Sequence, residues 1–401
     1  MMSKKGPQLR FEGFTDDWEE RKIKDIFKIT RGQVLAATET SEKKSDISPF
    51  PVYSSQTKNN GLMGYYKDYL FDTAITWTTD GANAGTVSYR SGRFYSTNVN
   101  GVLISDKGYT NKAISEILNL EAWKWVSHVG NPKLMNNVMG DISIMIPSSF
   151  EEQDRLSDFL NQLDDTIALH QHKLDLLKEQ KKGYLQKMFP KNGAKVPELR
   201  FAGFADDWEE RKLGDEVKIN GRIGFRGYTQ ADIVTKETGV LAYSPTNIVN
   251  NRLYRKQSDT YITKQKYRES PEIMVKNSDI LFVKTGSTLG KSALVQGINY
   301  HATVNPQIVI IRSNELDEYF LSVILTSYNI LKRINTIKIG GAIPTMTETE
   351  LKKFPIQVPK STEQKKIGSF FKQLDNTIAL HQRKLDLLKE QKKGFLQKMF
   401  V

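Results

Sequence analysis

The 401-residue sequence contains no cysteine, few histidines and no long apolar run. The absence of cysteine excludes disulfide bonds, thiolate zinc sites and a cysteine nucleophile, and it fits a reducing cytoplasm. The five histidines do not have the spacing of metal ligands. No stretch of about 18 apolar residues occurs, and residues 1–5 lack the apolar core of a signal peptide. We therefore expect a soluble, cytoplasmic protein with no membrane span and no metal site.

What the chain has instead is length and positive charge. It carries 58 Lys and Arg against 46 Asp and Glu, which gives a net charge of +12 and a pI near 9.4. The excess is spread along the chain, without a basic tail. A basic folded protein favours a polyanionic partner such as nucleic acid, although many basic proteins bind nothing acidic. Chain length favours two domains.

The dominant feature is an internal repeat. Residues 9–22 recur almost unchanged as residues 199–212. A second block, residues 163–189, recurs as residues 374–400 with only three differences. The order is therefore a short block, a variable segment and a long block, followed by all three again.

The variable segments differ in length and sequence. Trp18 and Trp208 are 190 residues apart and Leu163 and Leu374 are 211 apart, so the second segment is 21 residues longer. A tandem duplication alone would also produce this order of blocks. Drift after duplication, however, would not spare the flanks so thoroughly. The contrast favours flanks that serve one common partner and middle segments that serve two different targets.

The second block predicts a long amphipathic helix in each copy. Apolar residues alternate at spacings of four and three over more than four heptads, which is typical of a coiled coil. Ser149 with Glu152 and Ser361 with Gln364 resemble capping boxes at the helix starts. We expect the two helices to pack antiparallel as a rod, with pseudo-twofold symmetry and a globular domain at each end. The predicted seam comprises Leu163, Ile167, His170, Leu174, Leu177, Leu374, Ile378, His381, Leu385 and Leu388.

Polar residues interrupt this seam. His170 and His381 fit a register device or half-buried, satisfied groups. The alternative is a metal pair, which the lack of nearby carboxylates in the seam disfavours. Lys181 and Lys392 are expected to extend out of the seam toward solvent.

The variable segments predict β-rich domains. Residues 23–147 and 219–358 alternate short apolar stretches with Gly, Asn, Ser and Thr, as strands joined by tight turns do. Short helices are expected at residues 111–119 and 316–334. The segments also align faintly with one another, for example residues 75–87 with 281–293. The expected fold class is α+β, with two β-rich mixed domains of one fold joined by the two long helices.

No convincing catalytic centre is present. Residues 286–292 resemble a phosphate-binding loop, but only three residues separate the glycines where a Walker A loop has four. The Asn/Asp-Pro-Pro-Tyr/Phe signature of amine methyltransferases is absent. Asp16-Asp17 and Asp206-Asp207 each precede a tryptophan in the repeated block, which favours a structural or docking element over an acid/base pair.

Together these patterns resemble the specificity subunit of type I restriction-modification enzymes. The resemblance rests on two copies of Leu-Arg-Phe-x-Gly-Phe-x-Asp-Asp-Trp-Glu, two β-rich variable domains, and two helices containing Leu-Asp-x-Thr-Ile-Ala-Leu-His-Gln. Residues 340–344, 352–359 and Glu363-Gln364 also resemble the approach to the family's helix. The first domain departs from the pattern, because residues 130–134 replace the glycine-pair turn. The resemblance covers essentially the whole chain.

The resemblance implies a DNA-recognition subunit without catalytic residues or cofactors of its own. Two modification subunits would dock on the helices and supply S-adenosylmethionine for adenine methylation. Restriction subunits with ATP-driven translocation, and the associated Mg, would join them. The implied boundaries are residues 1–150 and 191–361 for the target-recognition domains, and 151–190 and 362–401 for the helices.

Each domain must then bring side chains to base edges of double-stranded DNA, chiefly in the major groove, while Lys and Arg hold phosphates. We expect exposed polar residues of the strand-turn regions to make these contacts. The candidates are Tyr53, Ser54, Gln56, Asn83, Arg90 and Arg93 in the first domain, and Asn247, Arg252, Arg255, Lys284, Ser287 and Lys291 in the second.

Three other functional classes remain open at this stage. An autonomous two-headed DNA-binding regulator would bind DNA tightly by itself and would not need two preserved helices. A scaffold that binds only proteins would show no salt-dependent affinity for DNA. An enzyme in its own right would need catalytic residues that the sequence lacks.

Overall fold

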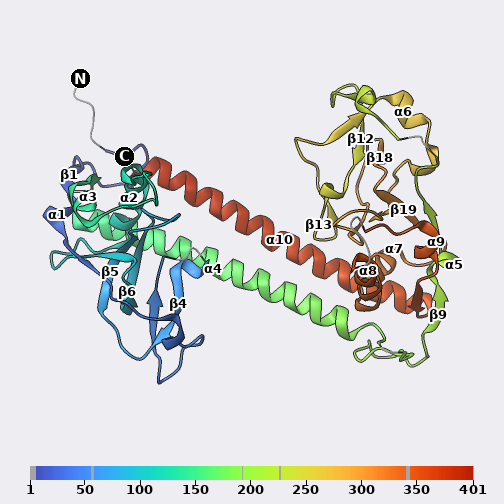
Figure 1. Cartoon of the computed structure of the whole chain (residues 1–401), viewed down its shortest axis with the longest axis horizontal. Coiled ribbons are helices and arrows are strands. Elements are labelled where there is room, and N and C mark those ends of the chain that lie inside the picture. Colours follow the sequence, from blue (N-terminus) through green and yellow to red (C-terminus); the bar gives the residue numbers. More distant parts are fainter. Residues whose placement is uncertain (1–5, 56–57, 192, 225–226, 340–343, 401) are drawn as a thin grey trace. The chain divides into compact units, whose positions relative to one another are not determined.

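The computed structural model describes residues 6–55, 58–191, 193–224, 227–339 and 344–400 (Figure 1). The chain forms two compact units. Unit 1 consists of Met1–Gln171 and Arg383–Val401, and unit 2 of His172–Gln382. Each unit therefore contains one half of each long helix, α4 (Phe150–Lys187) and α10 (Ser361–Met399).

Unit 1 is built on a six-stranded sheet in the order β2-β7-β5-β6-β3-β4. All its neighbours are antiparallel except β3 and β6, which pair in parallel. A separate ribbon joins β1 to β8. The elements are β1 (Glu19–Lys22), α1 (Ile23–Ile26), β2 (Lys28–Arg31), β3 (Phe50–Tyr53), β4 (Leu62–Tyr66), β5 (Phe71–Thr78), β6 (Val87–Ser96), β7 (Asn100–Ile104), α2 (Lys112–Ala122), α3 (Asn136–Asp141) and β8 (Ser143–Ile146).

The main core of unit 1 lies between the sheet, α2 and the two long helices. Trp77 from β5 and Ile114 from α2 are completely buried there, and Trp18 from the repeated block is 2% exposed. Leu160 of α4 and Phe400, which follows α10, join the same core. Burial of apolar surface is the main favourable term in folding. The long helices are therefore part of this core.

Unit 2 repeats this design with one sheet split in two. The orders are β10-β19-β16-β17 and β11-β15-β12-β18, with β12 and β18 in parallel. The elements are β9 (Glu209–Lys212), α5 (Leu213–Glu216), β10 (Val217–Asn220), β11 (Ile233–Val234), β12 (Val240–Tyr243), β13 (Ile248–Val249), β14 (Arg252–Leu253), β15 (Thr260–Ile262), α6 (Lys264–Arg268), β16 (Ile280–Val283), β17 (Ser292–Leu294), β18 (Ala302–Val304), β19 (Ile308–Ser313), α7 (Glu318–Ile324), α8 (Tyr328–Ile339), α9 (Glu348–Lys352) and β20 (Pro355–Val358).

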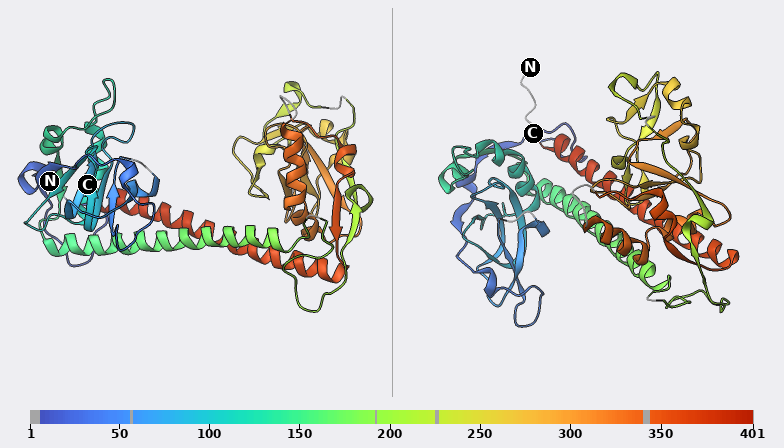
Figure 2. Two further views of the ribbon diagram at one scale, coloured as in Figure 1. Left: turned by 60° about the horizontal axis from the view of Figure 1, so that its bottom comes forward. Right: turned by 45° about the vertical axis from the view of Figure 1, so that its right-hand side comes forward.

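Inside each unit α4 and α10 run side by side in opposite directions (Figures 1 and 2). In unit 1 the rings of Phe159 and Phe395 meet edge to face at 5.1 Å, and in unit 2 those of Tyr184 and Phe370 do so at 5.0 Å. The expected fold class, α+β with two β-rich domains, two long antiparallel helices and an internal repeat, is confirmed. The helix expected at residues 316–334 is interrupted, because α7 and α8 are separate.

The predicted seam follows the buried side of both helices. Leu174 and Leu385 are each 1% exposed. The others, Leu163, Ile167, His170, Leu177, Leu374, Ile378, His381 and Leu388, are half-buried.

The expectation that the seam lysines extend to solvent is wrong. Lys181 Nζ lies 2.5 Å from Asp375 of the other helix in unit 2, and Lys392 Nζ lies 2.6 Å from Asp164 in unit 1. Both lysine side chains are about one-fifth exposed. A half-buried ammonium needs a carboxylate partner, and the antiparallel helix supplies one at the equivalent position in both units.

Candidate nucleic-acid interface

In each unit an arginine of the first repeated block is held by a glutamate at the start of a long helix. Nε and Nη2 of Arg10 lie 2.6 and 2.7 Å from the two carboxylate oxygens of Glu152. Arg200 makes the same bidentate pair with Glu363 at 2.7 and 2.8 Å. Both carboxylates are 1% exposed. These pairs tie the repeated block to the helix and explain why both recur together.

The next residue of each helix makes a second tie, in place of the expected capping boxes. Gln153 donates from Nε2 to the carbonyl of Pro147, and Gln364 donates to that of Pro359, both at 2.9 Å. Glu152 is engaged by Arg10, and among the described residues it makes no hydrogen bond with Ser149. The glutamate–glutamine pair therefore anchors the helix start to the preceding strand and block.

Both units close a strand pair with the same glycine turn. Gly81 and Gly85 follow β5 with φ of 92° and 85°, and Gly286 and Gly290 follow β16 with φ of 100° and 89°. Such positive φ values favour glycine. In each turn the second glycine donates its N–H to the last residue of the preceding strand at 2.9 Å. The turn is thus a shared part of the fold on which each unit displays different side chains.

In unit 1, four of the expected DNA contacts gather around one cavity of about 110 Å³. Ser54, Asn83 and Arg90 line it, where the ends of β3, β5, β6 and β7 meet. The guanidinium of Arg90 stacks on the ring of Tyr53, 3.9 Å from the ring centre. Asn83 donates from Nδ2 to the carbonyl of Ser55 at 3.0 Å, which holds the glycine turn against the end of β3.

Two candidates are not exposed as the sequence predicts. Arg90 is 6% exposed, and burial lowers the pKa of its guanidinium. Asn247 is 2% exposed and donates to the carbonyl of Tyr254 at 2.9 Å and to Asp259 at 2.6 Å. Because these bonds occupy its amide, Asn247 orders its own loop.

The remaining candidates of unit 1 lie apart from the cavity or outside the described residues. Arg93 on β6 has a side chain that is 57% exposed, with Nε 3.7 Å from Asp72. Its guanidinium lies 4.9 Å from the ring centre of Tyr69. Gln56 lies outside the described residues.

In unit 2 three candidates occupy the glycine turn. Ser287 and Lys291 are exposed there. Lys284, at the start of the turn, is half-buried, with Nζ 3.3 Å from Glu348. The turn therefore presents a hydroxyl and an ammonium group to solvent, where the turn of unit 1 carries an amide.

The other two candidates of unit 2 line a second cavity of about 290 Å³ together with tyrosines. Arg255 donates to the hydroxyl of Tyr261 at 2.7 Å and lies 4.8 Å from the ring centre of Tyr300. Tyr300 and Tyr243 join their hydroxyls at 2.7 Å, and burial raises the pKa of Tyr243. Arg252 lines the same cavity. The two guanidinium groups and the tyrosine hydroxyls make this wall rich in hydrogen-bond donors, which suits phosphate and base acceptors.

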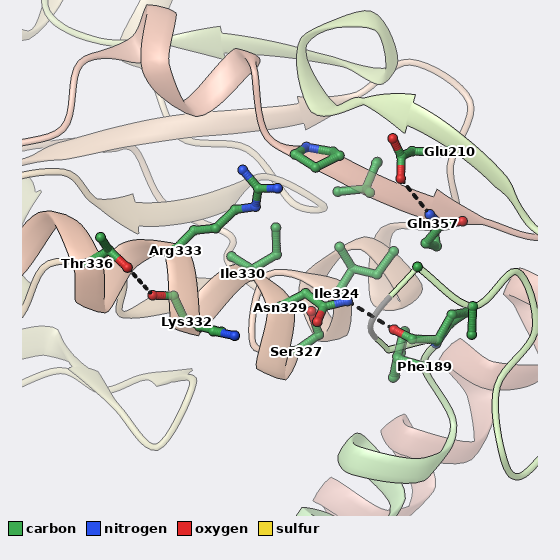
Figure 3. A pocket seen from close by; sticks show the side chains of 15 residues that line it. Phe189, Glu210, Ile324, Ser327, Asn329, Ile330, Lys332, Arg333, Thr336 and Gln357 are labelled. Carbon is green, nitrogen blue, oxygen red and sulfur yellow. Dashed lines mark hydrogen bonds between the residues drawn. The ribbon is translucent and has the colours of Figure 1, made fainter.

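A third cavity, of about 360 Å³, belongs to the frame of unit 2 (Figure 3). It lies beside α8, which contributes Arg333 and Thr336, and beside the β9–β20 ribbon, where Gln357 donates to Glu210 at 2.9 Å. None of the predicted DNA contacts lines it. We therefore exclude it from the candidate interface.

Sequence reasoning missed several polar residues that line the unit 1 cavity. Thr76 and Thr78 on β5, Ser88 on β6 and Asn100 on β7 all face it. Polar residues at alternate positions of a strand that is otherwise apolar are the signal for such a wall, because side chains two apart share a face.

The described part of the chain offers neither a metal cluster nor a membrane span. No group of three or more His, Asp and Glu residues is placed to hold a metal ion in the described ranges. No described helix has the length and apolar character needed to cross a membrane.

Comparison with known proteins assigns the family. The sequence profile of the type I restriction modification DNA specificity domain matches residues 15–179 and again residues 205–390. A type I specificity subunit homologue of Mycoplasma pneumoniae is 26% identical, over 94% of this chain and 96% of its own. The specificity subunit of the type I restriction enzyme MjaVIII of Methanocaldococcus jannaschii is 22% identical, over 95% and 91%.

A solved structure shares the fold. The crystal structure of the S subunit of a type I restriction-modification system from M. genitalium has a TM-score of 0.69 and 14% identity, and 99% of each chain is covered. The two profile matches take in most of the sequence and fall once on each copy of the repeat. The chain therefore belongs to the type I restriction-modification DNA specificity family, as the resemblance in its sequence indicates.

Proposed function

We propose that this chain is the DNA-reading subunit of a type I restriction-modification complex and recognises a bipartite sequence, with one half-site for each unit. The observation that carries this proposal is the contrast between the repeated frame and what it displays. Arg10–Glu152 and Arg200–Glu363 are the same ion pair, and both units present the same glycine turn. The side chains around the turns differ, as two different half-sites require.

The direct contacts to DNA belong to the same proposal. Major-groove edges of bases are read by Arg, Asn and Ser side chains, and phosphates by Lys and Arg. We assign this role in unit 1 to Tyr53, Ser54, Asn83, Arg90 and Arg93, and in unit 2 to Arg252, Arg255, Lys284, Ser287 and Lys291. The target-recognition domains would be residues 1–150 and 191–361.

The partner subunits are part of the same proposal. The long helices, residues 151–190 and 362–401, are near-identical over residues 163–189 and 374–400. They therefore offer two equivalent surfaces, which suits two copies of one modification subunit. Those subunits would bind S-adenosylmethionine, and restriction subunits would bind ATP and Mg. The family is one of specificity subunits, so catalysis belongs to the other chains and the rival reading as an autonomous regulator is not favoured.

The test is to express the chain with its modification subunit and to map adenine methylation on random DNA. We expect methylation of one split motif. Exchanging residues 23–147 for the corresponding segment of a relative should change only one half of the motif. Exchanging residues 219–358 is the matched control and should change only the other half. Absence of association, methylation that is indifferent to this chain, or a change of both halves by one exchange would contradict the proposal.

A further inference from the structure

The two units differ systematically at one place in the sheet. In unit 1, β5 pairs with β6 and β7, and in unit 2, β16 pairs with β17 and β19. The strand registers therefore show which residues of the two units occupy equivalent positions. At five equivalent positions, a polar residue of the unit 1 cavity wall is replaced by an apolar residue in unit 2. The pairs are Thr76 with Leu281, Thr78 with Val283, Ser88 with Ala293, Arg90 with Val295, and Asn100 with Ile308.

In unit 2 these positions are ordinary core. Leu281, Val283, Ala293, Val295 and Ile308 are all at most 2% exposed and pack in one apolar cluster. The same fold is thus stable with apolar side chains there, and packing does not require the polar set of unit 1. Because buried polar groups are costly when they are not fully bonded, the polar set needs another explanation.

Arg90 carries a buried charge without a countercharge. Its Nε donates to Thr76 Oγ1 at 3.3 Å, and its guanidinium rests on the ring of Tyr53. In the described part of unit 1, no carboxylate forms an ion pair with it. A stacked tyrosine is a weak substitute for a carboxylate, because the ring attracts the cation through its quadrupole and carries no net charge. The buried guanidinium therefore lines a polar cavity with its charge uncompensated.

We propose that this cavity binds a phosphoryl group, either a phosphodiester of the recognised DNA or a free phosphate. An anion would neutralise Arg90, whereas a neutral base would leave the charge uncompensated. The wall offers the hydroxyls of Ser54 and Ser88 as hydrogen-bond donors beside the guanidinium. Thr76 and Asn100 donate to protein acceptors, Thr76 to the carbonyl of Ser88 and Asn100 to that of Tyr53, and so hold the wall in place. The volume of about 110 Å³ is several times the roughly 10–15 Å³ that one water molecule needs, so the cavity has room for a small polar ligand.

The DNA form of this proposal rests on the proposed function, and the free-phosphate form does not. It also makes the units unequal, because unit 2 has apolar residues in place of all five polar ones. A phosphoryl contact in this cavity would therefore be made only by unit 1.

The first experiment measures thermal unfolding of the full chain with inorganic phosphate against chloride at equal ionic strength. Phosphate should raise Tm by roughly 2 to 4 °C at saturating concentration. Arg90→Met should abolish this rise, and Arg90→Gln serves if the first variant does not fold. Lys28→Met is the matched control, because it removes an exposed positive charge from β2 of the same sheet outside the cavity, and it should keep the rise.

The second experiment measures binding of duplex DNA containing the methylated motif as salt is varied, with the same variants. If the phosphoryl group comes from DNA, Arg90→Met should weaken binding about tenfold and reduce the slope of log affinity against log salt by about one. If only free phosphate binds, the variant should lose the Tm rise while its DNA affinity stays unchanged.

The outcomes separate this inference from the proposed function. A wild-type chain that binds its motif, with neither a phosphate-dependent Tm rise nor an effect of Arg90→Met on DNA affinity, would overturn the cavity and leave the function intact. A Tm rise that depends on Arg90, in a chain that confers no DNA recognition, would support the cavity and contradict the function.

Discussion

At the scale of single residues, two buried carboxylates, Glu152 and Glu363, tie the long helices to the repeated blocks. Each is matched by a bidentate arginine, which satisfies both oxygens in surroundings almost without solvent. A buried ion pair adds little stability compared with an apolar pair of the same shape. Removal of one partner, however, leaves the other charge buried and unpaired. The main role of these pairs is therefore to specify that the repeated block meets the start of the long helix. Their net contribution to stability is small.

Arg10→Met should lower the free energy of unfolding by about 3 to 5 kcal/mol, because Glu152 would remain buried without its partner. Denaturant unfolding of the full chain measures this. The double variant Arg10→Met/Glu152→Met is the control and should recover much of the loss. A double variant as unstable as the single one would show that the stranded charge is not the cause.

The stability of unit 1 should fall in acid through Asp164. Burial raises the pKa of this carboxyl, but hydrogen bonds from Lys112 and Lys392 outweigh it and hold the pKa below its usual range. A pKa depressed in the folded state adds stability above the unfolded value, about 3.9, and this is lost as pH falls through the folded pKa. Tm measured from pH 6 to pH 3 should therefore drop.

Asp164→Asn should flatten that drop, since the amide does not titrate. Asp158→Asn changes an exposed carboxyl on the same helix and should leave the acid dependence as in the wild type. Equal acid sensitivity of all three proteins would rule out Asp164 as the source.

At the scale of elements, each long helix is stabilised by the core that its first turns enter. Phe371 of α10 is completely buried in unit 2, where its ring lies 6.2 Å from that of Phe189, just beyond α4. The strand pairing, in contrast to the helix contacts, differs between the two units. Continuous β6 pairs with both β5 and β3, whereas unit 2 uses separate β17 and β18 for the equivalent pairings. The sheet therefore tolerates the division of one strand into two, whereas the contacts of the long helices recur in both units.

Phe371→Ala should destabilise the protein by about 3 to 5 kcal/mol, because it leaves a large cavity between helix and sheet. Leu380→Ala on the same helix removes a side chain that is 67% exposed and should change stability by less than about 0.5 kcal/mol. Chemical denaturation of the two variants provides the comparison. Similar losses would mean that the core contact of Phe371 does not anchor the helix.

At the scale of the whole molecule, the same backbone hydrogen bond occurs once in each copy of the repeat. The N–H of Leu9 donates to Lys398 at 2.8 Å, and that of Leu199 donates to Lys187 at the same distance. Residues 9 and 398 therefore meet within unit 1 as residues 199 and 187 meet within unit 2.

A circular permutant that joins Phe400 to Gly6 by a short linker and opens between Gly193 and Ala194 should fold. Opening there breaks one turn bond, from the N–H of Ala194 to Lys191, and leaves the bond of Leu199 in place. Circular dichroism should match the wild type and Tm should lie within a few degrees. A permutant opened within α2, which crosses the core of unit 1, is the control and should be strongly destabilised.

The sequence by itself determined the features that depend on local pattern and repetition. Heptad spacing specifies the two helices, because side chains three and four apart lie on one face. Alternating apolar residues specify strands, and the repeated blocks specify that one design is used twice. The resemblance of the repeated blocks to type I specificity subunits implied a reader of DNA, and the missing motifs indicated that the chain has no catalytic centre. None of these inferences needs a contact between distant segments.

The tertiary structure alone decided which side chains meet. Arg90 and Asn247 follow the pattern of exposed turn residues, yet packing buries both, one against Tyr53 and the other against Asp259. Lys181 finds Asp375 on a helix nearly 200 residues away in sequence. Burial and pairing depend on segments far apart in the chain, whereas periodicity reports only on neighbours. For this reason the fold was predictable from the sequence, and the cavity beneath Arg90 was not.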